Sequence, residues 1–342
     1  MTAIESTTRS IAAHRPLGKT GMLVSPVGMG CMGLTHASGD PLPDSEAKRV
    51  VRAAYDMGYT FFDTAECYVG LRADGTVAHN EDVVGAALAP VRDQVVIATK
   101  FGVAHNADRT LSLDSSPATI RRSVEGSLRR LRTDHIDLYY QHRIDPKVAP
   151  EEVAETMGEL IAEGKVLAWG ISETGEDYLR RAHAVCPVSA VENRYSMAAR
   201  WHAPMIELCR ELGITFVAFS PMANGLLTGA YGAKTKFEGA QDYRGGMPQY
   251  TEAGQAAAAP LIELLHRVAS AHGATPAQVS LAWMLAEHDN VVPIPGSRKP
   301  ERLRENLDAA QVALTAGELA QIDALLDTVD IPVFGGHAAG AK

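Results

Sequence analysis

The sequence predicts an α/β fold, a single (β/α)8 (TIM) barrel, from two observations. Short apolar runs alternate along the chain with amphipathic runs of helical period, which indicates βαβ units. The apolar runs are nearly continuous, as is typical of parallel strands buried on both faces. Eight such runs predict closure into a barrel. The expected strands are 27–30, 60–63, 95–100, 136–142, 166–172, 188–193, 214–220 and 291–297.

Helix signals lie between these strands. Ser116 followed by Pro117 is typical of a helix N-cap with proline at the first helical position. Apolar residues three and four apart then form a stripe on each helix, and Gly58 and Gly164 end two of them. We expect helices near 47–57, 117–131, 153–163, 256–272, 276–287 and 316–327. Two of these fall between the last two strands, one more than a minimal barrel requires.

The domain organisation follows from these elements. We expect an N-terminal hairpin before the first strand and a long functional loop over 221–254, where Gly, Asn, Gln and Pro are frequent. The barrel domain is predicted to cover 15–328. A flexible N-terminus, 1–14, and a C-terminal tail, 329–342, flank it.

Composition excludes several classes of function. The 342 residues are 46% hydrophobic and 21% charged, which is ordinary for a globular protein. The formal charge of −9 argues against nucleic acid as a partner, since phosphate binding requires a basic face. No apolar run approaches the ~20 residues of a membrane helix, and no signal peptide is expected. The four cysteines form no CxxC pair and are interpreted as reduced thiols of a cytoplasmic protein.

Polar residues follow the apolar strand interiors at their carboxyl ends, where active sites of α/β barrels are built. They are Asp63, Lys100, His142, Ser172, Asn193, Ser220 and Ser297. Asp63, Lys100 and His142 stand on three neighbouring strands, and Asp and Lys are seldom buried unless they are paired. No metal-ligand spacing and no serine or cysteine nucleophile arrangement accompanies them.

Tyr68 completes a set that can protonate an oxygen. A tyrosine hydroxyl is ordinarily too weak an acid at neutral pH, with a pKa near ~10. A nearby ammonium on Lys100 is expected to lower that pKa, and Asp63 to keep the lysine charged. His142 can orient a carbonyl oxygen by hydrogen bonding. Cys67, next to Tyr68, is interpreted as an inert thiol.

Seven short motifs occur in the order and spacing of a known family: FFDTAECY, VVIATK, DLYYQH, GISE, FSP, IPGS and ERLRENL. Together they resemble the aldo-keto reductases, particularly bacterial members, from about Arg15 to about Leu326. That family is a (β/α)8 barrel that binds NADPH without a Rossmann fold. The resemblance implies an NADP(H)-dependent oxidoreductase that reduces small-molecule aldehydes and ketones. It also implies Tyr68 as general acid, Lys100 and Asp63 as its tuning pair, and His142 as the carbonyl-orienting group.

The resemblance implies cofactor contacts at Gly30, Ser172, Glu192, Phe219, Ser220, Pro221, Leu227, Gly296, Ser297, Arg298, Arg302, Glu305 and Asn306. Ser172 and Glu192 would face the nicotinamide carboxamide, and Phe219 would stack on its ring. Backbone groups from Pro221 to Leu227 would line the pyrophosphate. Ser297, Arg298 and Arg302 match the 2′-phosphate region, followed by adenine contacts at Glu305 and Asn306. A helix beginning near Pro300 would favour that phosphate, which predicts NADPH over NADH.

One departure from the family pattern concerns the sixth strand. Relatives usually have Gln and, two residues later, Glu, where this chain has Glu192 and Arg194. A carboxylate cannot donate a hydrogen bond to the carboxamide oxygen. Residues two apart on a strand share a face, so we expect Glu192 to pair with Arg194. We also expect Glu192 to weaken nicotinamide orientation or to favour the positively charged, oxidised ring.

Three other interpretations of the fold or function compete with this one. Gly28, Gly30 and Gly33 spell the GxGxxG of a Rossmann fold, but a breaker-rich loop follows instead of a helix. A barrel aldolase with a Schiff base on Lys100 explains the lysine but not Tyr68 or the IPGS segment. A cofactor-binding regulatory subunit is disfavoured because all four catalytic residue types are present. The sequence is compatible with a homo-oligomer. It does not identify the natural substrate.

Overall fold

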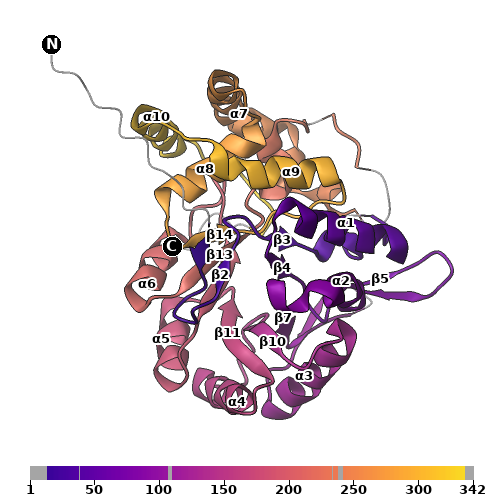
Figure 1. Ribbon diagram of the computed structural model, residues 1–342. Helices are drawn as coiled ribbons and strands as arrows, with labels where there is room; N and C mark the ends of the chain where they lie inside the picture. The colour runs from indigo at the N-terminus through magenta and orange to yellow at the C-terminus, as the bar shows by residue number, and fades with distance from the viewer. Residues whose placement is uncertain (1–13, 38, 107–109, 233, 238–241, 336–342) are drawn as a thin grey trace.

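The computed structural model describes residues 14–37, 39–106, 110–232, 234–237 and 242–335, with strands in the middle and helices around them (Figure 1). The expected flexible N-terminus therefore lies outside the described residues except for residue 14. Residues 336–342 of the expected tail lie outside them as well.

A single sheet of eight parallel strands forms the centre of the molecule. Its order is β14-β13-β12-β11-β10-β7-β4-β3, so each strand pairs with the preceding sheet strand in the chain. The expected strands are confirmed: β3 (Met29–Gly30), β4 (Phe61–Asp63), β7 (Val96–Phe101), β10 (Ile136–Gln141), β11 (Val166–Ser172), β12 (Ala190–Arg194), β13 (Thr215–Phe219) and β14 (Val291–Pro293). The fold is the predicted (β/α)8 barrel.

The barrel closes between its first and last strands, and glycine permits the close approach. The Gly28 amide donates to the Pro293 carbonyl at 2.9 Å. A Cβ at Gly30 would lie 2.7 Å from the Ile294 carbonyl oxygen, and one at Gly296 would lie 2.5 Å from the Gly30 carbonyl oxygen. Both distances are too short for any side chain. Gly28 and Gly30 of the GxGxxG pattern therefore serve barrel closure, and the Rossmann interpretation is excluded.

Helices cover the outside of the sheet (Figure 1). They are α1 (Asp44–Met57), α2 (Asn80–Leu88), α3 (Pro117–Leu131), α4 (Pro150–Ala162), α5 (Glu176–Val185), α6 (Ala203–Leu212), α7 (Glu252–His272), α8 (Pro276–Glu287), α9 (Pro300–Asp308) and α10 (Ala316–Leu326). Shorter 3-10 turns are η1 (Met32–Leu34), η2 (Ala89–Gln94) and η6 (Ala309–Gln311). The expected signals are in place: the Ser116 hydroxyl accepts from the Thr119 amide, and Gly58 has a φ of 111°.

The predicted N-terminal hairpin, β1 (Arg15–Pro16) and β2 (Leu23–Val24), closes the amino end of the barrel. Leu17 and Val24 are fully buried and pack with the apolar residues that fill the barrel interior. The Arg15 guanidinium donates to the Leu285 and Val291 carbonyls, both at 2.6 Å. Ligands can therefore reach the interior only from the opposite end, where the strands finish.

Further segments surround the carboxyl end of the barrel. Hairpins β5 (Val69–Leu71) with β6 (Val77–His79) and β8 (Val103–His105) with β9 (Leu111–Leu113) follow β4 and β7, and the first projects from the barrel (Figure 1). The expected long loop after β13 contains the turns η3 (Ala223–Thr228), η4 (Tyr243–Gly246) and η5 (Pro248–Tyr250). The Phe334 amide donates to Gln249 Oε1 at 2.9 Å, and Ile331 and Val333 are buried, so residues before 336 pack on this loop and the core.

Candidate active site

Strand alternation gives the barrel interior a polar end. Phe61, Val96 and Ala98 point inward and belong to the interior apolar cluster. Asp63 stands two residues after Phe61 and Lys100 two residues after Ala98, so both share that inward face. The sheet order places β4, β7 and β10 side by side. The strand alternation that buries the apolar side chains in the barrel therefore also places Asp63 and Lys100 inside it, at the carboxyl end.

The structure brings together the four residues expected to act in catalysis. Lys100 Nζ donates to Asp63 Oδ1 and, at 3.0 Å, to the Thr64 carbonyl. Nζ also lies 5.2 Å from the centre of the Tyr68 ring. The Tyr68 and His142 rings meet edge to face, with centroids 5.7 Å apart. Three consecutive sheet strands and their loops thus supply an acid–base cluster at one point.

Lys100 stays charged although it is fully buried. Burial alone would lower its pKa, but the carboxylates of Asp63 and Glu192 raise it, and the net pKa lies above the ordinary value. Glu192 Oε2 lies 3.4 Å from Nζ. The Lys100 ammonium therefore lies close to two buried carboxyl groups, those of Asp63 and Glu192.

Glu192 does not form the expected pair with Arg194. Its carboxyl group turns toward Lys100, while the Arg194 guanidinium lies over the Phe219 ring, 4.9 Å from its centre. The expectation was wrong because the shared strand face points into the barrel. There the buried ammonium attracts Glu192 more strongly than a guanidinium nearer the mouth.

At neutral pH the two carboxyl groups beside Lys100, those of Asp63 and Glu192, retain one proton between them. Burial, and then the neighbouring Asp63, raise the pKa of Glu192 to about 8, against the opposing charge of Lys100. Burial also raises the pKa of Asp63. Asp63 Oδ2 has no hydrogen-bond partner among the described residues. We assign the retained proton to Glu192, since Asp63 has the direct hydrogen bond from Lys100.

The expected net lowering of the Tyr68 pKa is wrong for this structure. Burial raises that pKa, and the charge of Lys100 lowers it by less, so the net pKa lies above the ordinary value. The side chain is only 9% exposed, which explains why burial prevails. Tyr68 is thus fully protonated at neutral pH, and Lys100 stabilises the phenolate only as that proton leaves.

His142 is held as a neutral imidazole. Burial, and then the charges of Arg143 and Lys100, lower its pKa well below the ordinary value. Its Nδ1 lies 3.3 Å from Cys67 Sγ. A neutral histidine can donate one hydrogen bond and accept another.

The residues expected around a nicotinamide adjoin this cluster. Ser172 and Glu192 are register partners on neighbouring strands. The Ser172 hydroxyl accepts from Arg143 Nη1 at 3.0 Å, and the Arg143 guanidinium lies 5.9 Å from the Phe219 ring centre. Sequence reasoning missed Arg143. Its position directly after His142 was the available signal.

Backbone geometry is unusual where the pyrophosphate is expected. Ser220, Ala223 and Asn224 have φ of 50°, 47° and 59°, a left-handed conformation that non-glycine residues rarely adopt. This turn lies between Phe219 and Leu227, where Pro221 is also found. Within this turn the Ala223 amide donates to the Ser220 carbonyl at 3.0 Å, and the Gly225 amide donates to the Met222 carbonyl at 2.9 Å.

The residues expected around the adenosine end have unsatisfied polar atoms. Arg298 donates through Nε to the Gly33 carbonyl, but its buried Nη2 has no hydrogen-bond partner among the described residues. In the same described part of the chain, the buried atoms Glu305 Oε1 and Asn306 Nδ2 also lack partners, while Arg302 pairs with Glu305 at 2.6 Å. Ser297 precedes α9, and its hydroxyl accepts from the Lys299 amide at 3.1 Å. Such unsatisfied donors and acceptors, on α9 and just before it, fit a ligand with phosphate and base edges.

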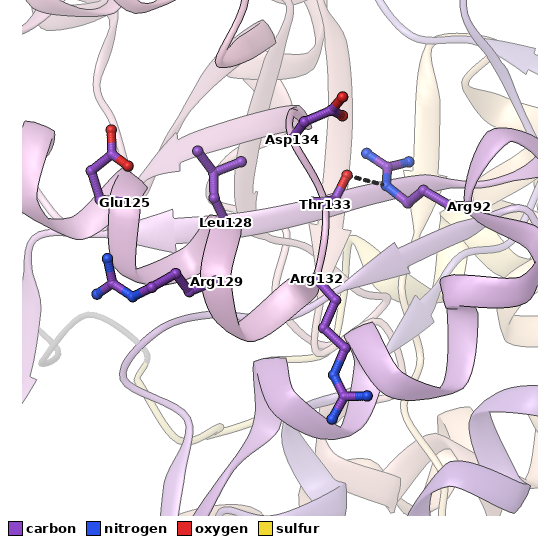
Figure 2. Close-up of a pocket in the computed structure, with 7 residues that line it drawn as sticks. All are labelled: Arg92, Glu125, Leu128, Arg129, Arg132, Thr133 and Asp134. Carbon is purple, nitrogen blue, oxygen red and sulfur yellow. Dashed lines mark hydrogen bonds between the residues drawn. The ribbon is translucent and has the colours of Figure 1, made fainter.

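A hollow of about 720 Å³ lies on the outer surface (Figure 2). Its lining residues are Arg92, Glu125, Leu128, Arg129, Arg132, Thr133 and Asp134. It lies between α3 and the start of β10, at the end of the barrel remote from Lys100. The charges there are mixed, and Arg92 is already bound to Thr133 at 3.0 Å and to Asp137 at 2.7 Å. We therefore place no chemistry in it.

Metal-ligand clusters and membrane-spanning helices are both absent from the described part of the chain. No group of three or more His, Cys, Asp or Glu side chains there could hold a metal ion. None of its helices combines the length and the apolar character that a membrane crossing requires.

Comparison with known proteins gives consistent matches. The model of the aldo/keto reductase family matches residues 26–327. The chain is 39% identical to Probable aldo-keto reductase 1 of Glycine max, over 90% of this chain and 86% of that protein. It is 36% identical to Aldo-keto reductase str7 of Strobilurus tenacellus, over 93% of each.

Solved structures agree. The glycerol dehydrogenase AKR11B4 of Gluconobacter oxydans superposes with a TM-score of 0.82 at 26% identity, covering 96% of this chain and 99% of that one. An aldo/keto reductase from Klebsiella pneumoniae, solved with NADP and acetate, has a TM-score of 0.69 at 27% identity, covering 96% and 98%.

The proton on Glu192 makes stability depend on pH. The folded chain binds this proton up to about pH 8, whereas an unfolded glutamate releases it near ~4.3. Stability is therefore lost as pH rises between these values. Relative to the natural chain, Glu192→Gln should gain roughly 3–5 kcal/mol of unfolding free energy between pH 5 and pH 9.

Urea unfolding at several pH values measures this difference. The exposed Glu155→Gln on α4 is the matched control and should follow the natural chain. Parallel pH profiles for all three proteins would show that Glu192 is ionised throughout.

Proposed function

Since this chain belongs to the aldo/keto reductase family, we propose that it reduces aldehydes or ketones to alcohols with NADPH. The observation that supports this best is the position of the Lys100 ammonium, 5.2 Å from the centre of the Tyr68 ring. A protonated phenol beside a permanent positive charge is suited to give a proton to a carbonyl oxygen. When bound, NADPH supplies the hydride that reduces the carbonyl carbon.

Tyr68 acts as the general acid. Its phenolic proton passes to the carbonyl oxygen, and the phenolate that remains is stabilised by Lys100. This stabilisation is small in the resting protein and grows as negative charge develops on the phenol oxygen. An interaction that strengthens toward the transition state accelerates the reaction instead of merely tightening binding. The buried surroundings of Lys100 increase its effect, because few water dipoles screen its charge.

The neighbouring side chains keep Lys100 charged and orient the carbonyl group toward Tyr68. The carboxylate of Asp63 holds Lys100 in its charged state. His142 donates a hydrogen bond from its neutral ring to the carbonyl oxygen and so orients it toward Tyr68. The hydrogen bonds from Lys100 to Asp63 and to the Thr64 carbonyl fix where the charge lies.

NADPH would be held along the carboxyl ends of the last four strands. Ser172 and Glu192 would contact the carboxamide, Phe219 the nicotinamide ring, and the turn from Ser220 through Pro221 to Leu227 the pyrophosphate. Gly30 and Gly296, at the barrel seam, would lie near the nicotinamide. Ser297, Arg298 and Arg302 would bind the 2′-phosphate, and Glu305 and Asn306 the adenine. The unpartnered atoms of Arg298, Glu305 and Asn306 support this assignment, as does NADP in the Klebsiella pneumoniae relative.

The alternative functions are less compatible with this geometry. A Schiff-base lysine must be a neutral amine before it attacks a carbonyl, whereas the carboxylate of Asp63 holds Lys100 charged. A regulatory subunit needs no acid–base cluster. We further propose a cytoplasmic location, because all four cysteines are free thiols.

Removal of the Tyr68 hydroxyl tests the general acid. Tyr68→Phe should lower kcat for an activated aldehyde such as nitrobenzaldehyde by about 10²–10⁴-fold, the usual contribution of general acid catalysis. NADPH binding should stay within about twofold, since the phenol contributes to chemistry more than to cofactor affinity. NADPH oxidation and fluorescence titration measure the two effects.

The control is Tyr139→Phe, which removes a buried tyrosine hydroxyl from β10. Residue 139 belongs to the core between sheet and helices and faces away from the interior. Near-normal turnover of Tyr68→Phe would remove Tyr68 from its assigned role.

Arg298 should distinguish the two nicotinamide cofactors. Only NADPH has a 2′-phosphate, so Arg298→Ala should weaken NADPH binding about 10–100-fold, as expected for a lost charge-assisted hydrogen bond. NADH binding should change by less than about threefold. Calorimetric titration with both cofactors measures the difference between the two losses. Arg304→Ala, on the helix α9 that follows Arg298, is the control. Equal losses for NADPH and NADH would place the phosphate elsewhere.

Glu192 should make the preference for the oxidised cofactor depend on pH. Below about pH 8 the group is neutral, and above it the carboxylate attracts the positive nicotinamide ring. The affinity for NADP⁺ relative to NADPH should rise roughly three- to tenfold between pH 6.5 and pH 9. In Glu192→Gln the ratio should stay constant over this range. A ratio that changes equally in both proteins would contradict a role for Glu192 at the nicotinamide.

A further inference from the structure

Cys67 contacts the ring of His142 directly. It stands between the end of β4 and β5, in a turn fixed by hydrogen bonds from the Tyr68 amide to the Ala65 carbonyl and from the Val69 amide to the Cys67 carbonyl. This turn directs Sγ to within 3.3 Å of His142 Nδ1. The two side chains are 8% and 6% exposed, so water competes little for the contact.

Both partners of this contact are neutral. Burial raises the pKa of the Cys67 thiol to about 12, although the charge of Lys100 opposes it, so the sulfur keeps its proton. The charged groups that face His142 come from two strands: Arg143 follows it directly, and Lys100 belongs to β7. His36 and His105 also face it and add no negative charge. A thiolate–imidazolium pair is therefore excluded.

A neutral imidazole has two tautomers, with its proton on either Nδ1 or Nε2. Among the described residues, Cys67 provides the one side-chain partner within hydrogen-bond distance of the His142 ring. An imidazole nitrogen is a good acceptor, whereas a thiol sulfur is a weak one. The stronger arrangement has S–H donating to Nδ1, which leaves the ring proton on Nε2. The outer partner of a histidine commonly sets its tautomer in this way.

We propose that Cys67 is a positioning residue for carbonyl reduction: its thiol donates to His142 Nδ1 and thereby keeps on Nε2 the proton through which the ring donates a hydrogen bond to the substrate oxygen. This inference rests on the proposed function, in which His142 orients the carbonyl. It assigns to Cys67 a hydrogen-bonding task in place of the inert role expected from the sequence. The thiol does not touch the reacting atoms and acts only through the histidine.

Two substitutions separate hydrogen bonding from packing. Cys67→Val fills a similar volume without a donor, and Cys67→Ser restores a donor. One net hydrogen bond corresponds to about 2–10-fold in rate. Cys67→Val should therefore lower kcat by about that factor without changing NADPH affinity, while Cys67→Ser stays within about twofold of the natural chain. Cys209→Val, a buried thiol on α6, is the control for loss of a cysteine.

The tautomer itself can be observed without turnover. Two-bond ¹⁵N–¹H correlation spectra of the ¹⁵N-histidine-labelled full chain distinguish protonation at Nε2 from protonation at Nδ1. His142→Gln identifies the His142 signal among the 12 histidines. We expect the Nε2–H form in the natural chain and in Cys67→Ser, and a mixture of tautomers in Cys67→Val.

A proton on Nδ1 in the natural chain, or an unchanged tautomer in Cys67→Val, overturns the role of Cys67. Equal loss of kcat in Cys67→Ser and Cys67→Val overturns it as well, because packing would then explain both. A chain with the expected tautomer that reduces no carbonyl contradicts the proposed function instead. The two failures are thus distinguishable.

Discussion

The constraint on which the site depends is a permanent positive charge inside a closed apolar barrel. An unpaired ammonium at the depth of Lys100 would lose its proton, because burial disfavours the charged form. Asp63 supplies the hydrogen-bonded counter-charge, and Glu192 adds a second carboxyl group at 3.4 Å. With two acids on one base, the cluster retains a proton, and Glu192 becomes the group whose charge depends on pH. Burial raises the pKa of Tyr68 and lowers that of His142, while the charge of Lys100 lowers the pKa of both.

Barrel closure and site construction depend on each other. The amide of Gly28 and the carbonyl of Pro293 join the first and last strands. At this seam no side chain fits at Gly30 or Gly296. Only after closure does the interior become a dry cylinder with a single open end, since the N-terminal hairpin fills the other. The low local dielectric that lets Lys100 act on the phenol is therefore a property of the whole fold.

The periodicity of apolar residues and the spacing of polar ones determined which features could be predicted from the sequence. Apolar runs located all eight strands, and the polar residues at their carboxyl ends identified Asp63, Lys100 and His142. The partners of Glu192 and Cys67 were not predictable, because they depend on contacts between segments far apart in the sequence. Cys67 and His142, for example, are 75 residues apart. Local reasoning paired Glu192 with Arg194 on its own strand. The closed barrel instead directs Glu192 to Lys100, on the far side of β10 and β11.

The opposing effects on Tyr68 explain how a buried phenol can serve as an acid. If Lys100 alone determined the pKa, the resting phenol would ionise more readily and lose the proton before a substrate arrived. Burial prevents this by penalising the phenolate when no carbonyl is present. As the proton moves to a carbonyl oxygen, the growing negative charge meets an ammonium that is already in place and needs no rearrangement. Burial thus preserves the acid at rest, and Lys100 assists it at the moment of transfer.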